Sequence, residues 1–257
     1  MIFEISPGAA SSPVILHVPH ASRAITAAAR SSLLVDDAAV TEELDNLTDA
    51  HTDVLAHRAA SFAKVPPWIF ENRWSRLVVD PERFPDEREE MRAVGMGAVY
   101  THGFAGRKLR DDDSVRDQNL LQTHFGPYSE AFAALTADRC ATAGRCVIVD
   151  VHSYPSASLP YEMHGLGPRP AVCLGTDPDH TPAWLVAAAE AAFPLTGVNS
   201  PFAGTYVPLD FYGRDRRVSS LMIEIRRDGY MTEPGGPFHD GLDRLAAGLT
   251  QLINALS

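Results

Sequence analysis

The sequence predicts an α/β protein with a mostly parallel sheet. Short runs of apolar residues, rich in β-branched side chains, alternate along the chain with longer segments in which apolar residues recur at helical spacing. Strands that alternate with helices build parallel sheets covered on both faces, so their inner strands are continuously apolar. The 257 residues suffice for one such domain over residues 1–257, and we find no repeat or linker that would divide it.

Six short apolar runs predict the strands. The first, Pro13–His20, is expected to break at Pro19, because proline cannot continue a central ladder. A second run starts at Cys146 and stops at Asp150. The remaining predicted strands are 68–70, 77–79, 171–175 and 219–225.

Five segments have the apolar spacing of helices. They are residues 25–34, 54–62, 118–140, 182–193 and 240–256. Two further segments lack such spacing. Residues 86–118 are charged, contain glycine and are weakly periodic, which predicts a long excursion or lid rather than core. Residues 156–170 are rich in proline and glycine and are expected to form a loop at a site.

Composition excludes several classes of function. The net charge of -11 argues against nucleic-acid binding, which needs a clustered basic face. Three cysteines without a Cys-x-x-Cys pair do not make a disulfide framework and favour a reducing compartment. The N-terminus has no basic, apolar signal pattern, and no apolar run is long enough for a membrane span. We therefore expect a cytoplasmic protein that binds neither nucleic acid nor membranes.

Polar residues follow the predicted strands. His20 ends the first strand, Asp150 and His152 end the strand that starts at Cys146, and Glu224 lies within the last apolar run. Ligands of open α/β sheets bind beyond the carboxyl ends of the strands, so these side chains are expected at a cleft. Taken singly, each histidine is also compatible with a capping or structural role. A buried glutamate, however, is costly unless it has a partner or a function.

Other charged residues near the predicted element ends have two readings. Asp45, Asp49 and Asp53 lie at or before the start of the helix predicted for residues 54–62, where carboxylates commonly cap helices. The arginines Arg73, Arg76 and Arg83 follow predicted strands. They are either surface charges or a clamp for a substrate carboxylate, which guanidinium groups bind in a bidentate manner.

The strand-end residues predict a hydrolytic metal site. Two imidazoles and one carboxylate are a usual ligand set of catalytic zinc, with one position left open. A further carboxylate that does not bind the metal can accept the proton of the attacking water, and Glu224 suits that role. Asp150 can orient a ligand imidazole from behind.

Six segments of the chain form a recognisable series between residues 18 and 231. They are Val18–Ser22, Thr48–Asp53, Ser75–Arg83, Asp150–Ser153, Asn199–Gly204 and Ile223–Met231. In this order they resemble the N-formylglutamate amidohydrolase family, also called N-formylglutamate deformylases.

The resemblance implies a zinc hydrolase with the three-layer, phosphorylase/hydrolase-like α/β fold of zinc carboxypeptidases and aspartoacylases. Carboxypeptidases carry a His-Ser-Tyr stretch with a zinc-binding histidine, similar to His152–Tyr154, and a Glu-Leu-Arg-Asp stretch with the catalytic glutamate, similar to Glu224–Asp228. The implied activity is cleavage of an N-acyl amino acid, with N-formyl-L-glutamate as the leading candidate.

The implied roles follow residue by residue. Zinc is expected on His20, Asp49 and His152, with Glu224 as the catalytic base and Arg76 stabilising the oxyanion. The residues expected to contact the substrate are Arg83, Asp80, Arg73 and Tyr154.

The chain departs from the family pattern at three points. Glu82 stands where an asparagine is expected, and its charge would repel a substrate carboxylate unless it points away. Ser129 stands where a histidine is expected. Arg23 replaces the glutamate of a His-x-x-Glu ligand pair, so the third ligand must come from elsewhere. Asp49 is our choice, and the alternatives are His51, Asp45 and Asp53.

Two other functions remain open at this point. The same chemistry would serve another N-acyl amino acid, or a small peptide cut in the manner of a carboxypeptidase. A protein that has kept the scaffold but lost catalysis would be an α/β binding module.

Overall fold

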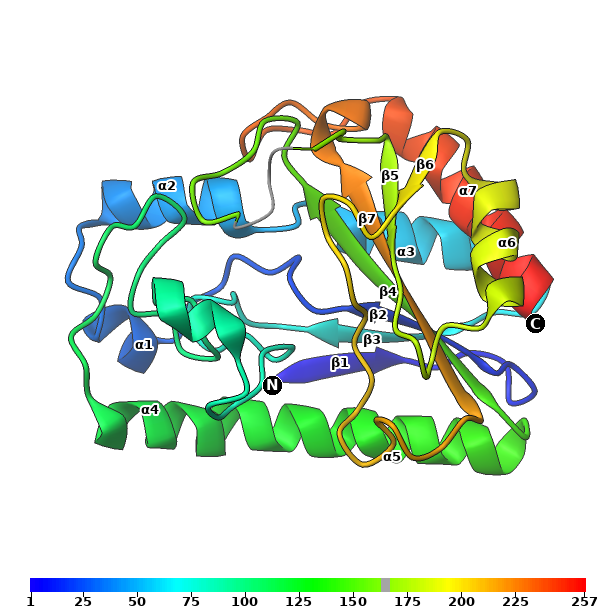
Figure 1. The fold of residues 1–257 in the computed structure, drawn as a ribbon, viewed down its shortest axis with the longest axis horizontal. Coiled ribbons are helices and arrows are strands. Elements are labelled where there is room, and N and C mark those ends of the chain that lie inside the picture. Colours follow the sequence, from blue (N-terminus) through cyan, green and yellow to red (C-terminus); the bar gives the residue numbers. More distant parts are fainter. Residues whose placement is uncertain (163–166) are drawn as a thin grey trace.

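A seven-stranded mixed sheet, in the order β1-β3-β2-β4-β7-β5-β6, forms the centre of the protein in a computed structural model that describes residues 1–162 and 167–257 (Figure 1). Strands β3, β2, β4 and β7 are parallel neighbours, whereas β1 pairs antiparallel with β3 and β5 antiparallel with β7. The strands are β1 (Phe3–Ser6), β2 (Val14–Val18), β3 (Trp68–Asn72), β4 (Cys146–Tyr154), β5 (Val172–Gly175), β6 (Thr196–Val198) and β7 (Val218–Arg226).

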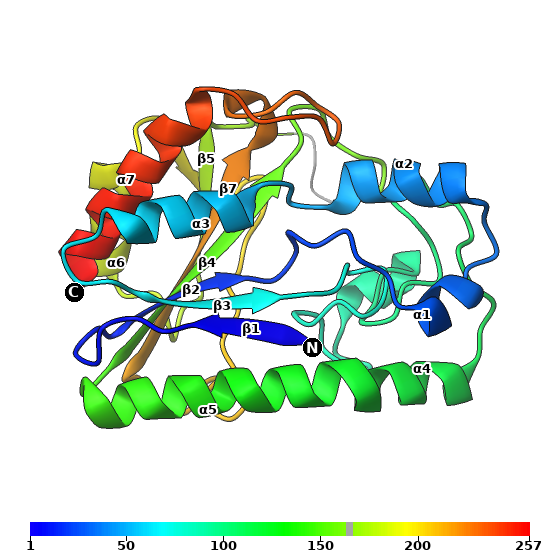
Figure 2. The same ribbon diagram turned by 180° about the vertical axis from the view of Figure 1, so that it is seen from behind.

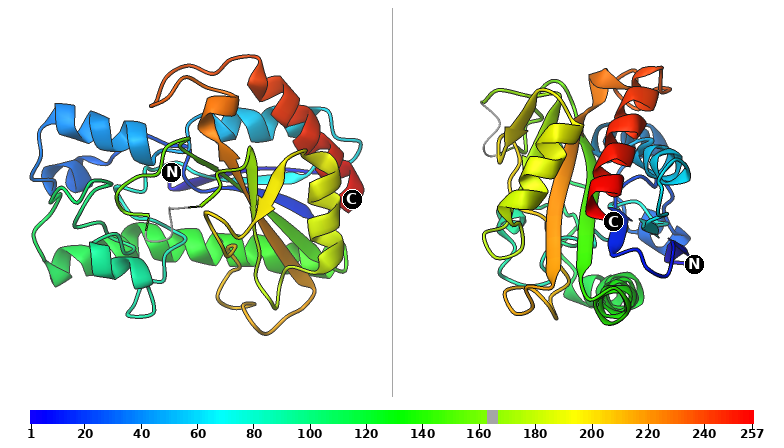
Figure 3. Two further views of the ribbon diagram at one scale, coloured as in Figure 1. Left: turned by 45° about the horizontal axis from the view of Figure 1, so that its top comes forward. Right: turned by 90° about the vertical axis from the view of Figure 1, so that its right-hand side faces the viewer.

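Helices cover both faces of the sheet, which confirms the predicted three-layer α/β/α class. Helices α3, α6 and α7 pack on one face and α5 packs on the other, as the views from both sides and from the end show (Figures 2 and 3). The helices are α1 (Ala27–Ser31), α2 (Asp37–Leu47), α3 (Thr52–Ser61), α4 (Ser114–Leu120), α5 (Gly126–Thr142), α6 (Ala183–Ala192) and α7 (Gly241–Leu256).

The two-residue period of the strands sorts the polar side chains onto one face. In β4, Val147, Val149 and Val151 face the layer of α3, α6 and α7, whereas Ile148 packs towards α5. Because successive side chains point to opposite faces, Asp150 and His152 lie on the α5 face. The same alternation in β2 and β7 puts His17 and Glu224 on that face. The carboxyl ends of these three strands therefore present their polar residues together.

One predicted strand is wrong. Leu77–Val79 is a buried turn, although the run is as apolar as a strand. Its burial comes from two small clusters outside the sheet. Leu77 packs with residues such as Met96 and Tyr100, and Val78 packs with residues such as Leu120. Apolar composition alone does not distinguish a strand from a turn that packs under a long loop.

The segment 86–118 is not excluded from the core. It contains a short 3-10 helix, Glu90–Val94, and the first residues of α4. Its Met96, Tyr100 and Leu109 are fully buried in the cluster that also holds Leu77. The predicted loop over 156–170 is confirmed for its described residues, and 163–166 lie outside the described part of the chain. Over the described residues, no helix is both long and apolar enough to cross a membrane.

Candidate active site

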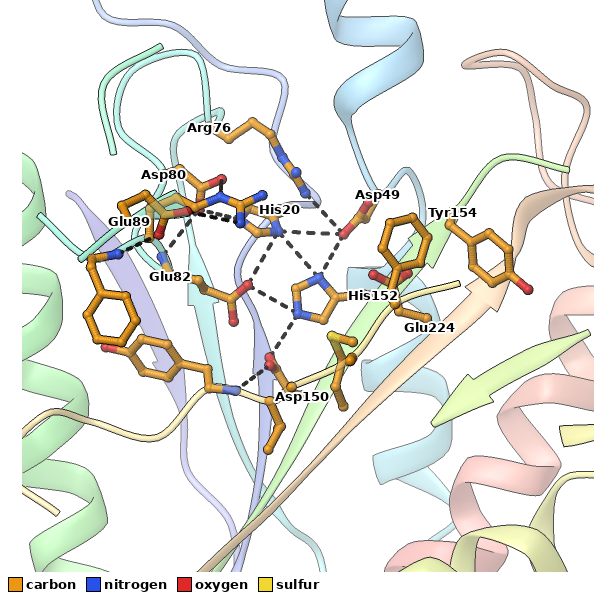
Figure 4. Close-up of a pocket in the computed structure, with 18 of the residues that line it drawn as sticks. His20, Asp49, Arg76, Asp80, Glu82, Glu89, Asp150, His152, Tyr154 and Glu224 are labelled. Carbon is orange, nitrogen blue, oxygen red and sulfur yellow. Dashed lines mark hydrogen bonds and ion pairs between the residues drawn. The ribbon is translucent and has the colours of Figure 1, made fainter. Parts of the chain in front are cut away.

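The polar strand ends line a cavity of about 500 Å³. His20 follows β2 by two residues, His152 lies in β4, and Glu224 lies opposite His152 in the β4–β7 register. Asp49 reaches the cavity from the connection between α2 and α3 (Figure 4). The structure therefore brings together the four residues that the sequence predicts as three metal ligands and a base.

Three nitrogen and oxygen atoms form a triangle with the dimensions of a zinc site. The Nδ1 atoms of His20 and His152 are 3.3 Å apart, and Asp49 Oδ2 lies 3.6 Å from the first and 3.1 Å from the second (Figure 4). Ligands about 2.0–2.2 Å from a tetrahedral zinc ion are about 3.3–3.5 Å apart. All three residues are at most 4% exposed. The residues present thus fit a zinc ion.

A carboxylate stands behind each histidine. Asp80 Oδ1 lies 2.8 Å from His20 Nε2, and Asp150 Oδ1 lies 3.1 Å from His152 Nε2. Asp80 also accepts a hydrogen bond from the Tyr100 hydroxyl at 2.8 Å. A carboxylate on the outer nitrogen fixes a metal-binding imidazole in the tautomer that presents its inner nitrogen. Asp80, predicted to contact substrate, is thus engaged by His20 and Tyr100.

Asp49 is ionised because basic groups surround it. Arg76 lies 3.4 Å from Oδ2, and Arg227 donates to Oδ1 at 3.1 Å. Burial raises the pKa of the Asp49 carboxyl, but Arg76 and the two histidines outweigh that effect and hold the pKa well below its usual range. Arg227 was not predicted as a site residue, although it lies within the Ile223–Met231 segment and is 3% exposed.

The surroundings of His20 and His152 favour positive charge on the two imidazoles. Burial lowers the pKa of His152, but Glu82, Asp150 and Asp49 outweigh it and raise the pKa well above its usual value. Burial and Arg76 likewise lower the pKa of His20, and Asp80 and Asp49 reverse the effect. In the metal-free protein these imidazoles hold protons that a metal ion must displace.

Glu224 has the environment of a general base. The residue is 8% exposed, and its buried Oε2 has no hydrogen-bond partner among the described residues. Burial raises the pKa of Glu224 to about 7, against the opposing effect of His152. A carboxyl group with a pKa near the operating pH is suited to accept a proton and return it.

Glu82 points into the cavity, which the sequence did not indicate. Its Oε2 lies 3.2 Å from His152 Nε2 and 3.7 Å from His20 Nδ1 (Figure 4). Its Oε1 lies 3.4 Å from His17 Nδ1. Two groups of donor atoms therefore include Glu82: one with His20 and His152, the other with His17 and Asp150. Glu82 is a second candidate for the third ligand of the site.

The alternative ligands from the acidic segment lie elsewhere. His51 Nε2 contacts the Gly236 carbonyl at 2.9 Å, and Asp45 pairs with Arg23 at 2.7 Å. Asp53 borders a shallow surface depression on α3. Among the described residues, only Asp49 of these four candidates lines the cavity.

The predicted substrate contacts are divided. Arg83 and Tyr154 line the cavity, with Arg83 3.6 Å from Asp80 and the Tyr154 hydroxyl donating to the Pro170 carbonyl. Arg76 also lines it. Arg73 does not reach the cavity: its half-exposed side chain points to Glu4, 3.5 Å away on β1. The reason is that the backbone turns after β3 ends at Asn72, so the side chains of Arg73 and Arg76 point in different directions.

Comparison with known proteins decides the family. The family model for N-formylglutamate amidohydrolase matches residues 12–231. The chain belongs to the N-formylglutamate amidohydrolase family. Membership in this family supports an amidohydrolase, and the six segments that carried the resemblance fall within the matched range.

Solved structures confirm the fold. The N-formylglutamate amidohydrolase of Ralstonia eutropha is similar with a TM-score of 0.82 at 21% identity, over 98% of this chain and 96% of that one. A gene product of Agrobacterium tumefaciens is similar with a TM-score of 0.68 at 18% identity, over 99% and 94% of the two chains. Comparison with curated protein sequences gave no match.

Proposed function

We propose that the protein is a zinc-dependent amidohydrolase that cleaves N-formyl-L-glutamate to formate and L-glutamate. The observation that carries the proposal is the triangle of His20 Nδ1, His152 Nδ1 and Asp49 Oδ2, whose sides match those between zinc ligands. Glu224 lies beside it, and its buried Oε2 has no hydrogen-bond partner among the described residues. Family membership supports the choice of substrate.

His20, Asp49 and His152 would hold the zinc ion, and Asp80 and Asp150 would orient the two imidazoles. When bound, zinc supplies Lewis acidity, which polarises the formyl carbonyl and makes a water molecule acidic near neutral pH. The ligand atoms are two nitrogens and one oxygen, a set typical of catalytic zinc.

Glu224 would move the proton of the reaction. It takes a proton from the attacking water, whose oxygen bonds to the formyl carbon. The C–N bond then breaks, and Glu224 returns the proton to the amine nitrogen of glutamate. A carboxyl with a pKa of about 7 is basic enough for the first transfer and acidic enough for the second.

Two arginines would bind the negatively charged groups of the reaction. Arg76 is buried at the cavity, and its Nε has no hydrogen-bond partner among the described residues. It is placed to stabilise the charge that develops on the carbonyl oxygen during attack. Arg83 is 28% exposed at the cavity and would bind a substrate carboxylate.

Glu82 supports a second candidate, the hydrolysis of a different N-acyl amino acid by the same chemistry. Its carboxylate faces the cavity and would repel a substrate carboxylate bound nearby. The two candidates share the metal site and the base, and they differ only in the group that occupies the space beside Glu82 and Arg83.

The test is metal content together with formate release. Purified protein should contain about one zinc per chain, release formate from N-formyl-L-glutamate, and lose that activity when the metal is chelated. Zinc without formate release, followed by amine release from another acylated amino acid, would select the second candidate. Protein that binds no zinc after incubation with the ion would contradict both candidates.

A further inference from the structure

His17 is a buried histidine that the proposed reaction does not use. It lies in β2, is fully buried, and faces α5, where its ring stacks on Phe132 with centroids 4.4 Å apart. Burying an imidazole is costly unless both of its nitrogens are hydrogen-bonded. Both are: Nδ1 lies 2.8 Å from Asp150 Oδ1, and Nε2 lies 2.6 Å from the Tyr128 hydroxyl.

The chemistry of the partners gives this chain of contacts one direction. An ionised carboxylate only accepts hydrogen bonds, so His17 Nδ1–H is the donor to Asp150. His17 Nε2 then accepts, and the Tyr128 hydroxyl donates to it. The other oxygen of Asp150, Oδ2, accepts from the backbone N–H of Tyr206 at 3.2 Å. With a neutral imidazole, these contacts place one proton on His17 Nδ1 and one on the Tyr128 hydroxyl.

The chain ends at a proposed metal ligand. Asp150 Oδ1, the oxygen held by His17, is also the atom 3.1 Å from His152 Nε2; this is an ion-pair contact, and Nε2 makes no hydrogen bond among the described residues. When His152 carries its proton on Nε2, its Nδ1 lone pair faces Asp49 and His20. The position and rotation of Asp150 thus decide how His152 is presented to a metal ion.

We propose that His17 and Tyr128 are positioning residues of the metal site, which hold Asp150 so that His152 presents Nδ1 to the metal. This inference rests on the proposed metal-binding function of His152. It assigns a purpose to the only side chains that connect α5 to the site through consecutive hydrogen bonds among the described residues.

The same atoms allow a different reading, which the test must separate. His17 Nδ1, Asp150 and Glu82 lie close enough to hold a metal ion of their own. We favour positioning because both nitrogens of His17 already have partners at 2.8 and 2.6 Å. If His17 were a ligand, the protein would bind a second metal ion per chain.

The experiment measures zinc stoichiometry and affinity by competition with a chelator. His17→Phe keeps the stacking on Phe132 but removes both hydrogen bonds, and it should weaken zinc binding by about 10–100-fold at an unchanged one zinc per chain. His17→Asn retains a donor towards Asp150 and should recover most of the affinity. Tyr128→Phe, which removes one hydroxyl, should weaken binding by a smaller factor and serves if His17→Phe does not fold.

His180→Phe is the matched control. His180 is 1% exposed, its Nδ1 lies 2.8 Å from the Val218 carbonyl, and its Nε2 accepts from Gly213 N–H at 2.8 Å. It is as buried and as fully bonded as His17 and stacks on Tyr212 at the cavity wall, but among the described residues it makes no hydrogen bond to Asp150 or to a proposed metal ligand. His180→Phe should leave zinc affinity unchanged, so a loss in both variants would show general destabilisation and overturn the positioning role.

Two further outcomes overturn the inference separately from the proposed function. Two zinc ions per chain in the natural protein and one in His17→Phe would make His17 a ligand. If both His17→Phe and Tyr128→Phe bound zinc with the affinity of the natural protein, the hydrogen bonds through His17 would have no effect on metal binding. If no zinc binds at all, the proposed function fails. Nitrogen NMR of ¹⁵N-labelled histidine still tests the series of hydrogen bonds from Tyr128 through His17 to Asp150. A His17 proton on Nε2 rather than Nδ1 contradicts that series.

Discussion

Among single residues, Glu224 is the one on which turnover should depend most. Glu224→Gln keeps the shape of the side chain but cannot accept a proton. We expect it to retain zinc and to lose turnover by about 10²–10⁴-fold. Glu71→Gln is the matched control, because Glu71 is also a buried strand glutamate and bonds to His57, 2.8 Å away, outside the cavity. Near-full activity in Glu224→Gln would remove Glu224 from the mechanism.

The pKa of Glu224 also predicts how stability depends on pH in metal-free protein. Its folded pKa of about 7 lies above the value of 4.5 for an unperturbed glutamate. The native state therefore holds this proton more tightly, and the resulting stability is fully present below pH 4.5 and lost as the pH rises through 7. The loss is about 3 kcal/mol at most.

Glu224→Gln has no titrating group at this position, so its stability lacks the pH dependence that comes from Glu224. In urea unfolding of chelated protein, the free energy of unfolding of Glu224→Gln minus that of the natural protein should rise by up to about 3 kcal/mol between pH 4.5 and pH 8. A difference that stays constant over this range would show that burial does not shift the pKa of Glu224.

Asp49 and Glu82 are the two candidates for the third ligand of the proposed metal site. Asp49→Asn should weaken zinc binding by more than about 100-fold, beyond the cost of losing an outer-shell partner. Glu82→Gln should weaken it much less and should change the preference among acylated amino acids. Chelator competition on both variants gives the ranking, and the reverse order would make Glu82 the ligand.

At the scale of elements, the close contact between β5 and the 199–207 segment shapes the cavity. A Cβ atom at Gly175, the last residue of β5, would lie 2.2 Å from the Gly204 carbonyl oxygen and 2.4 Å from the end of Met222. The 199–207 segment, which contains Gly204, supplies Phe202, Ala203 and Thr205 to the cavity wall. Only glycine permits this approach without a shift of the backbone.

Gly175→Ala should therefore displace the cavity wall. We expect a loss of about 1–3 kcal/mol in the free energy of unfolding and a raised KM, with zinc content unchanged. Gly229→Ala is the control, since a Cβ there has nothing within 4 Å. Equal KM values for Gly175→Ala and the natural protein would show that the segment does not contribute to substrate binding.

The elements differ in how well sequence predicts them. β4 and β7 were predicted because buried parallel strands are continuously apolar, and α7 because its apolar residues recur at helical spacing. Leu77–Val79 has the same composition as a strand but lies in a turn, because loops outside the sheet bury it. β1 and β6 were not predicted, since these edge strands are short and only partly buried.

For the whole molecule, the metal should act as a stabilising ligand. The three proposed ligands are buried and lie in β4, in the residues after β2 and in the α2–α3 connection, so one ion would tie distant segments together. Zinc at 100 times its Kd stabilises the folded state by about 2.7 kcal/mol. For a chain of this size the midpoint of thermal unfolding would rise by about 5–10 °C.

Calorimetric scans with and without a chelator measure this shift. Asp49→Asn should show a much smaller difference between the two conditions than the natural protein. A melting temperature that is indifferent to zinc and to chelation in the natural protein would contradict a metal ion at these residues.

The site was partly predictable from sequence for a physical reason. His20, His152 and Glu224 follow or end buried strands, and parallel strands bring their carboxyl ends together. Asp49 was chosen from an acidic segment whose spacing gave no way to separate it from Asp45 or Asp53; the fold separates them by turning only Asp49 inward.

The inward direction of Glu82 and the bonds of Arg227 and His17 depend on side-chain packing between distant segments. Arg227 donates to Asp49, 178 positions away along the chain, and His17 contacts Asp150, 133 positions away. No local pattern encodes such contacts, which is why they were missed or assigned differently.

The register that sets His152 beside Glu224 has a consequence for how this protein can diverge. Neighbouring strands are held about 4.8 Å apart by their backbone hydrogen bonds, so the spacing between His152, a proposed metal ligand, and Glu224, the proposed base, does not depend on any loop. Other parts of the cavity wall, where the proposed substrate would bind, come from the connections around Arg83 and Phe202. Randomising those connections while leaving β4 and β7 intact should yield variants that hydrolyse other acyl groups with the same proposed metal ligands and base.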